Sequence, residues 1–145
     1  MPIEVLLVED NEGDARLLRE LLLETNKNVR LNVVGDGHEA MAFLRYQERF
    51  LDAPRPSIIL LDLHLPKMSG LEFLALVKED PRLRTIPIIV LSSSRSEEDV
   101  VSSYQLMANC YLCKPAELKE FERLVRSLND FWLTRVKVPA DEQIA

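Results

Sequence analysis

The chain has 145 residues, close to the roughly 150 residues of one average domain. Hydrophobic residues make up 47% and charged residues 29%, the balance of a soluble globular protein with a buried core. The formal charge of −6 argues against a surface that binds nucleic acid. No basic leader with an apolar run opens the chain, no stretch is long enough to span a bilayer, and two cysteines make no disulfide scaffold. We therefore expect a cytoplasmic protein that contacts neither membrane nor nucleic acid.

Short apolar runs alternate along the chain with longer segments of helical spacing. Strands are predicted at residues 3–8, 30–34, 57–61, 86–91 and 109–113. The runs Val5-Leu6-Leu7-Val8 and Ile58-Ile59-Leu60-Leu61 are continuously apolar. Such runs are typical of strands that are buried on both faces, as in a parallel sheet covered by helices.

Four polar residues are predicted to begin helices, namely Asn11, Asp36, Ser69 and Ser96. Each of the last three is followed three residues later by an acid, which is the spacing of a capping box or a close variant. The apolar faces of these helices and of a fifth, C-terminal helix are expected in the core: Leu17, Leu18, Leu21, Leu22, Ala40, Phe43, Leu44, Leu71, Leu74, Val77, Val100, Val101, Tyr104, Leu118, Phe121, Leu124, Val125 and Leu128.

Five predicted strands thus alternate with five predicted helices. This alternation predicts an α/β fold with a doubly wound parallel sheet, right-handed crossovers and helices on both faces. The segment 51–56 contains two prolines and is interpreted as a stiff connector between the second helix and the third strand.

Polar residues follow four of the predicted strands. They are Glu9-Asp10, Asp62, Ser92 and Lys114-Pro115. In an open parallel sheet, ligands bind beyond the carboxyl ends of the strands, where these side chains would meet. Three converging carboxylates repel one another unless a cation joins them, and Mg²⁺ prefers such oxygen ligands. An aspartate can also attack phosphorus to form an acyl phosphate, with a lysine neutralising charge.

Each of these features has a simpler explanation when it stands alone. An acidic pair after a strand is often a solvated loop or a helix cap, and a lone lysine before proline is usually a surface residue. Their occurrence together at the ends of four strands favours an aspartate that accepts phosphate beside a metal ion.

The sequence resembles the receiver domain of bacterial two-component response regulators, over residues 3 to about 130. Four ordered motifs carry the resemblance: Val8-Glu9-Asp10, Leu61 to Gly70, Val90 to Ser93, and Tyr111 to Pro115. It implies a flavodoxin-like (βα)5 sheet with strand order 2-1-3-4-5, a receiver domain at 1–130, and a C-terminal extension at 131–145 without a separate output domain.

The resemblance also implies a role for each matching residue. Asp62 would accept the phosphoryl group from a histidine kinase. Asp10, Glu9, Asp62 and the backbone carbonyl of His64 would hold Mg²⁺, for which Mn²⁺ or Ca²⁺ could substitute. The acidic pair is Glu-Asp where many receivers have Asp-Asp, a departure that could alter metal affinity. His64 is either a solvent-facing loop residue or a screen against attacking water.

Three further residues match the switching part of the receiver pattern. Lys114 would pair with the phosphoryl group, and its bond to Pro115 is expected to be cis, an isomer that proline uniquely tolerates. Ser92 and Tyr111 resemble the switch pair, in which the hydroxyl moves toward the phosphoryl group and the ring turns inward.

Cys110 and Cys113 have the spacing of some redox and zinc motifs but fall on a predicted strand. Residues three apart in a strand face opposite sides, so neither a disulfide nor shared metal ligation is expected. We interpret both as reduced packing residues.

The C-terminal segment is unusually apolar, with Phe131-Trp132-Leu133 followed by Val136 and Val138. These residues would either fold back onto the domain or be buried in a partner, most simply a second copy of the chain. The tail, the proline-bearing insertion and Asn109-Cys110-Tyr111 together resemble the single-domain regulators of cyanobacterial phytochrome-type kinases. That subgroup implies a homodimer formed through the fourth helix, the fifth strand, the last helix and the tail, with tail contacts at Phe131, Trp132 and Leu133.

The leading hypothesis is a stand-alone phosphoacceptor switch that turns over no external substrate and acts through protein–protein association. One alternative is an adaptor that keeps the receiver fold without phosphorylation; the presence of Asp62, Asp10 and Lys114 counts against it. Another is a flavodoxin-like cofactor binder, but Glu9 and Asp10 would repel a cofactor phosphate.

Overall fold

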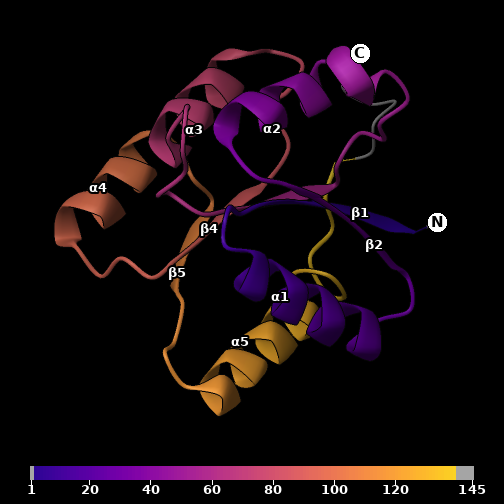
Figure 1. Cartoon of the computed structure of the whole chain (residues 1–145), viewed down its shortest axis with the longest axis vertical. Coiled ribbons are helices and arrows are strands. Elements are labelled where there is room, and N and C mark those ends of the chain that lie inside the picture. Colours follow the sequence, from indigo (N-terminus) through magenta and orange to yellow (C-terminus); the bar gives the residue numbers. More distant parts are fainter. Residues whose placement is uncertain (1, 140–145) are drawn as a thin grey trace.

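A five-stranded parallel sheet forms the centre of the structure, a computed structural model that describes residues 2–139 (Figure 1). The strands are β1 (Ile3–Val8), β2 (Val29–Val34), β3 (Ile58–Leu61), β4 (Ile88–Ser92) and β5 (Cys110–Cys113). Their order across the sheet is β2-β1-β3-β4-β5, and each neighbouring pair is parallel. The doubly wound fold and its strand order are therefore confirmed.

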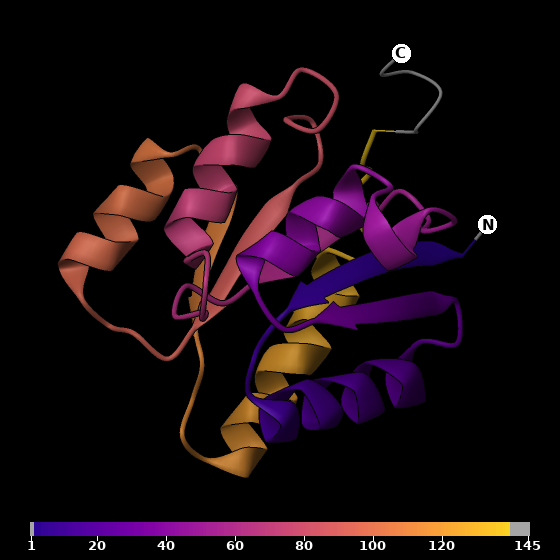
Figure 2. The same cartoon turned by 45° about the horizontal axis from the view of Figure 1, so that its top comes forward.

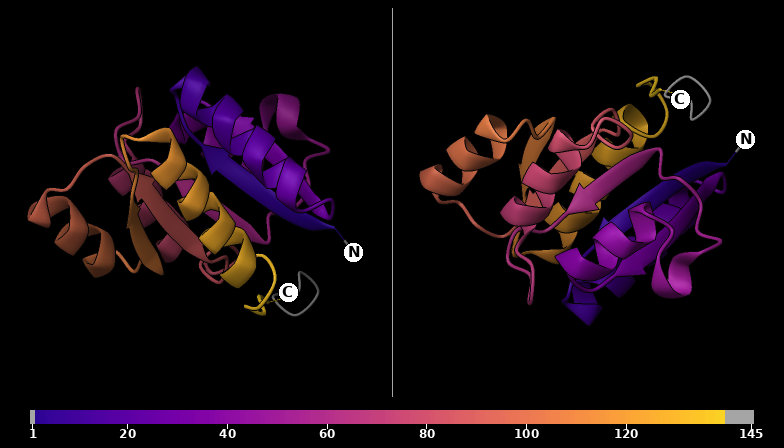
Figure 3. Two further views of the ribbon diagram at one scale, coloured as in Figure 1. Left: turned by 90° about the horizontal axis from the view of Figure 1, so that it is seen from below. Right: turned by 90° about the horizontal axis from the view of Figure 1, so that it is seen from above.

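Helices cover both faces of this sheet. They are α1 (Glu12–Thr25), α2 (Gly37–Leu44), α3 (Gly70–Glu79), α4 (Glu97–Gln105) and α5 (Leu118–Phe131), with a short 3₁₀ helix, η1 (Glu48–Phe50), after α2. Helices α1 and α5 lie side by side on one face, whereas α2 and α3 cover the other (Figure 3). Helix α4 contacts β5 and α3 at the edge of the assembly.

The four predicted helix starts are confirmed. In each helix the capping side chain accepts a hydrogen bond from the backbone N–H three residues later, at 2.9 Å for Asn11, 2.7 Å for Asp36, 3.2 Å for Ser69 and 3.4 Å for Ser96. These bonds satisfy N–H groups that the first helical turn leaves without a partner.

The core has two halves because the side chains of a strand alternate between the faces of the sheet. From β1, Leu6 and Val8 pack with α2 and α3, whereas Val5 and Leu7 pack with α1 and α5.

The prediction that Val101 and Tyr104 of α4 enter the core is wrong. Tyr104 is 47% exposed, Val101 is similarly exposed, and the helix buries Ser103 instead. The reason is that α4 packs at the edge of the sheet, so only a narrow strip of it is covered. Leu118, at the start of α5, is also exposed. The Tyr104 hydroxyl accepts a hydrogen bond from the backbone N–H of Tyr111 at 3.2 Å.

The segment after α5 folds back onto the domain. Leu133 is only 5% exposed, and it packs with half-buried Trp132 against the α1/α5 side of the core. Farther along, Val136 and Val138 line a cavity of about 90 Å³ with Ile3 and neighbouring residues. The end of α5 therefore lies near the start of β1 (Figure 2). Phe131 remains 57% exposed, and residues 140–145 lie outside the described part of the chain.

Both cysteines are free thiols, as expected. Cys110 packs into the α1/α5 side of the core, whereas the Cys113 sulfur lies 3.8 Å from the Ser94 carbonyl oxygen. Within residues 2–139, no helix combines the length and the apolar character that crossing a bilayer would require.

Candidate functional site

The carboxyl ends of four strands are aligned by the register of the sheet. Val8 of β1 pairs with Leu61 of β3, and the N–H of Asp62 donates to the Val8 carbonyl at 3.0 Å. On the other side, Ser92 ends β4, and its carbonyl accepts from the N–H of Lys114 at 2.8 Å. The residues that follow the strands are therefore brought to one edge, as the sequence predicted.

Three carboxylates meet at this edge. Glu9, Asp10 and Asp62 each present an oxygen within 4.8 Å of the others. Glu9 and Asp62 are buried, and Asp62 is only 8% exposed, whereas Asp10 faces solvent. Within the described residues, Asp62 Oδ1 is buried without a hydrogen-bond partner. A buried carboxylate oxygen in this state calls for a cation or a proton donor.

Lys114 is the cation nearest to this cluster. Its side chain is largely buried, and Nζ donates to Glu9 and, at 3.1 Å, to Asp14 Oδ2. Asp62 Oδ2 lies 3.9 Å from the same nitrogen. The sequence did not identify Asp14 as a partner of Lys114, because Asp14 lies in the first turn of α1 and not directly after a strand.

The carboxylates of this cluster outnumber its one ammonium group. Burial raises the pKa of Glu9 from 4.5 to about 7, with the nearby Asp62 charge adding to the effect and Lys114 opposing it. Burial alone would lower the pKa of Lys114, but its partners Glu9, Asp62 and Asp14 outweigh burial and raise that pKa. Three carboxylates beside one ammonium group, with one oxygen unpartnered, fit a hard divalent cation such as Mg²⁺.

The loop that follows Asp62 packs against its own backbone. Gly70, the first residue of α3, donates its N–H to the Leu63 carbonyl at 2.9 Å. A Cβ at Gly70 would collide with the Asp62 carbonyl oxygen and lie 2.6 Å from Leu63 Cα, so this close approach excludes any side chain. Only glycine therefore lets the start of α3 lie this close to the backbone of Asp62.

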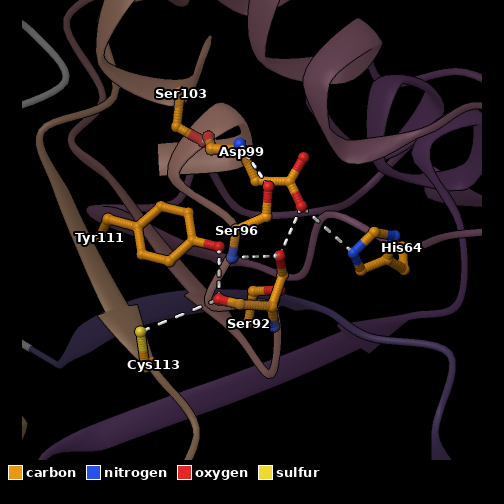
Figure 4. Close-up of polar contacts among 8 residues, drawn as sticks. His64, Ser92, Ser96, Asp99, Ser103, Tyr111 and Cys113 are labelled. Atoms are coloured by element: carbon orange, nitrogen blue, oxygen red, sulfur yellow. Dashed lines mark hydrogen bonds and ion pairs between the residues drawn. The ribbon is translucent and has the colours of Figure 1, made fainter. Parts of the chain in front are cut away.

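The predicted switch residues Ser92 and Tyr111 are joined through Ser94. Ser92 is fully buried, and its Oγ accepts from the Ser94 N–H at 3.1 Å. The Tyr111 hydroxyl donates to the Ser94 carbonyl at 2.9 Å. In Figure 4, Tyr111 approaches this region from β5, Asp99 from α4 and His64 from the loop after β3.

His64, two residues after Asp62, faces Asp99 of α4. Its Nε2 is 3.6 Å from Asp99 Oδ2, although most of the side chain is exposed. The sequence pattern did not indicate this pairing, because Asp99 belongs to α4, far along the chain. The metal-ligand role of the His64 carbonyl stays a prediction.

One expectation about the site is wrong. The peptide bond between Lys114 and Pro115 is trans, since the described residues contain no cis peptide bond. The two isomers of a bond before proline differ by only about 0.5–1 kcal/mol, so the proline alone does not decide between them.

Comparison with known proteins gives a consistent result. Residues 5–126 match the response regulator receiver domain. The chain is 45% identical to response regulator Rcp1 of Synechocystis sp. over 139 residues, which cover 96% of this chain and 95% of the relative. Among solved structures, it resembles the phosphorylated cyanobacterial phytochrome response regulator RcpA, with a TM-score of 0.93 and 43% identity, covering 97% of this chain and 100% of that one. It also resembles the Mn²⁺-bound form of Rcp1, with a TM-score of 0.91 and 46% identity, covering 96% and 100%.

Proposed function

The chain belongs to the response regulator receiver family, and on that premise we propose that Asp62 accepts a phosphoryl group from a sensor histidine kinase. The observation that carries the proposal is the buried Asp62 carboxylate, which has an unpartnered Oδ1 and lies beside two further carboxylates and Lys114. A buried nucleophile with a neighbouring ammonium group is suited to attack phosphorus.

The proposal includes Mg²⁺ as the metal, with Mn²⁺ or Ca²⁺ as substitutes. Glu9, Asp10 and Asp62 would hold it, together with the backbone carbonyl of His64. When bound, the ion neutralises negative charge on the carboxylates and on the phosphoryl oxygens. The similarity to the Mn²⁺-bound form of Rcp1 supports a divalent ion at this place.

The protein's own residues then have distinct roles. An Asp62 oxygen forms the new bond to phosphorus as the bond from phosphorus to the kinase histidine nitrogen breaks. Lys114, held by Asp14 and Glu9, provides a positive charge beside the transferred group. The Ser92 hydroxyl would donate to that group, and because Ser94 contacts both Ser92 and Tyr111, the move would couple the site to Tyr111.

Phosphorylation and dephosphorylation occur on Asp62, no external substrate is turned over, and the output is altered protein–protein association in the cytoplasm. The similarity to RcpA, named as a phytochrome response regulator, supports a phytochrome-type kinase as the partner.

The chain would also form homodimers. Exposed apolar side chains of α4, of the turn after it and of α5 offer a surface for a second copy; they include Val101, Met107, Leu118 and Phe131. Of the predicted tail contacts, Phe131 is exposed and Trp132 half-buried, whereas Leu133 is occupied within its own domain. Sedimentation of the wild type and of Val101→Asp tests this, because the charge should dissociate the dimer; a wild-type monomer at all concentrations would contradict it.

The phosphoacceptor role is tested by intact mass after incubation with Mg²⁺ and a small acyl-phosphate donor. The wild type should gain the mass of one phosphoryl group. Asp62→Asn, which keeps the shape of the side chain, should gain none, and neither should a chelator-treated sample. Asp52→Asn, in the connector before β3, is the matched control and should react like the wild type. An unmodified wild type, even with candidate kinases, would favour the phosphorylation-independent adaptor.

A further inference from the structure

The ammonium group of Lys114 has two carboxylate partners, and one of them, Asp14, follows no strand. Lys114 Nζ donates to Glu9 and, at 3.1 Å, to Asp14 Oδ2. Asp62 Oδ2 lies farther from the same nitrogen, at 3.9 Å. Because a lysine ammonium group has three N–H donors, the bonds to Glu9 and Asp14 leave one donor for an oxygen on Asp62 or on a phosphoryl group bound there.

The two partners hold this side chain from different elements of the fold. Glu9 follows β1, whereas Asp14 lies in the first turn of α1, where its own N–H donates to the capping Asn11 at 2.9 Å. The backbone of Lys114 is fixed by its N–H bond to the Ser92 carbonyl at 2.8 Å. A flexible four-carbon side chain can turn about one partner, whereas two partners fix the direction of its ammonium group.

Glu9 is not free to hold Lys114 on its own. Both of its carboxylate oxygens already accept hydrogen bonds, Oε1 from Lys114 and Oε2 from the Asn11 N–H at 3.2 Å. Glu9 is also one of the three carboxylates proposed to hold Mg²⁺, so it would divide its oxygens between the metal and these donors. Asp14 lies outside that group of three, and its contact with Lys114 is therefore the one that metal binding leaves intact.

We propose that Asp14 is a positioning residue that holds the Lys114 ammonium group beside the phosphoryl site. This inference rests on the proposed function of Asp62. Without Asp14, the ammonium group is free to turn about Glu9 and loses its fixed position beside Asp62, so phosphoryl uptake becomes slower. If Asp14 acted only as a negative charge, its loss would have the opposite effect, because an anionic phosphoryl donor would be repelled less.

Three variants separate the contact from the charge. Asp14→Ala removes the acceptor. Glu12→Ala is the matched control, because Glu12 is an exposed acid in the same first turn of α1 and its loss removes the same charge. Asp14→Asn removes the charge but keeps an oxygen that can accept from Lys114.

The first measurement is the rate of phosphoryl uptake from a small acyl-phosphate donor at saturating Mg²⁺. Asp14→Ala should react about threefold to tenfold more slowly than Glu12→Ala, in line with the loss of one partly exposed hydrogen bond between charged groups. Asp14→Asn should lie between these two variants. Glu12→Ala should react at least as fast as the wild type.

The same substitution in a chain without the ammonium group shows whether Asp14 acts through Lys114. Lys114→Met keeps an unbranched side chain but has no N–H donor, so adding Asp14→Ala should not slow its uptake further. Two results would overturn the proposal. One is an Asp14→Ala rate equal to or above that of Glu12→Ala, and the other is a slowing by Asp14→Ala that persists in Lys114→Met.

A second measurement does not depend on phosphorylation. The NMR signals of the Lys114 Cε methylene group should shift in Asp14→Ala but not in Glu12→Ala, and unshifted signals would count against the contact. If the wild type takes up no phosphoryl group while these signals respond, the proposed function fails and the contact between Asp14 and Lys114 stands. If the wild type reacts and Asp14→Ala reacts like Glu12→Ala, only the inference fails.

Discussion

The two ends of the central sheet have opposite chemistry. At the carboxyl end, Glu9, Asp62 and Lys114 are largely buried, and one Asp62 oxygen has no partner within residues 2–139. At the amino end, Leu133 and Trp132 close the core with apolar contacts, and the segment beyond them lies against Ile3.

The amino end of the sheet therefore serves mainly stability, and the carboxyl end serves mainly function. Buried like charges destabilise the fold, whereas buried apolar side chains stabilise it, so the carboxyl end depends on the packing of the rest of the sheet. Substitutions at the amino end should therefore change stability alone. Substitutions at the carboxyl end should change the chemistry, with or without a change in stability.

The largest expected effect comes from Gly70, which belongs to the carboxyl end. In Gly70→Ala the new methyl group collides with the Asp62 carbonyl, which should cost about 3 kcal/mol of unfolding free energy and abolish phosphoryl uptake. Urea unfolding and intact mass would measure both. The control is Gly35→Ala, where the nearest atom would lie at 3.6 Å and little should change. A Gly70→Ala protein that unfolds and reacts like the wild type would show that the loop adapts freely.

At the amino end, Leu133→Ala should lower the unfolding free energy by about 2–3 kcal/mol, because it leaves a cavity beneath α1 and α5. The rate of phosphoryl uptake in folded protein should not change. Phe131→Ala, at an exposed position two residues earlier, should cost much less. A slower uptake in Leu133→Ala would mean that the two ends are coupled, and the contrast would not hold.

A smaller effect concerns pH. The pKa of Glu9 is raised from 4.5 in the unfolded chain to about 7 in the folded protein, so the metal-free fold binds an extra proton between these values. The stability that this group contributes is fully present below about pH 4.5 and is lost as the pH rises through about 7. Mg²⁺ competes with that proton, so its affinity should be about tenfold lower at pH 6 than at pH 8.

Titration calorimetry at the two pH values measures this difference. The Glu9→Gln variant has no proton to lose, and its Mg²⁺ affinity should vary little across the same range. If the Mg²⁺ affinity of Glu9→Gln still varied with pH, the group that titrates would be a residue other than Glu9.

Much of the fold could be predicted because local signals agreed with the global arrangement. The runs at 5–8 and 58–61 became the central strands, and the four capping residues began helices where expected. The site followed from the fold, since residues after parallel strands must gather at one edge.

The remainder depends on contacts between distant segments. The spacing of Val101 and Tyr104 is that of a buried face, but only the position of α4 at the sheet edge decides that they are exposed. The contacts of Asp14 with Lys114 and of Asp99 with His64 join residues that are far apart in the chain, and no local pattern marks them.

The Tyr104 hydroxyl, which caps the N–H of Tyr111, has a consequence for self-association. β5 is an edge strand, and the open backbone groups of such a strand invite another chain to extend the sheet. β5 has only four residues, so the hydrogen bond from the Tyr111 N–H to the Tyr104 hydroxyl removes a large share of the backbone groups that another strand could pair with. At the β5 edge, copies of this chain should therefore meet through side chains rather than by adding a strand, and the same contact protects this edge against edge-to-edge aggregation.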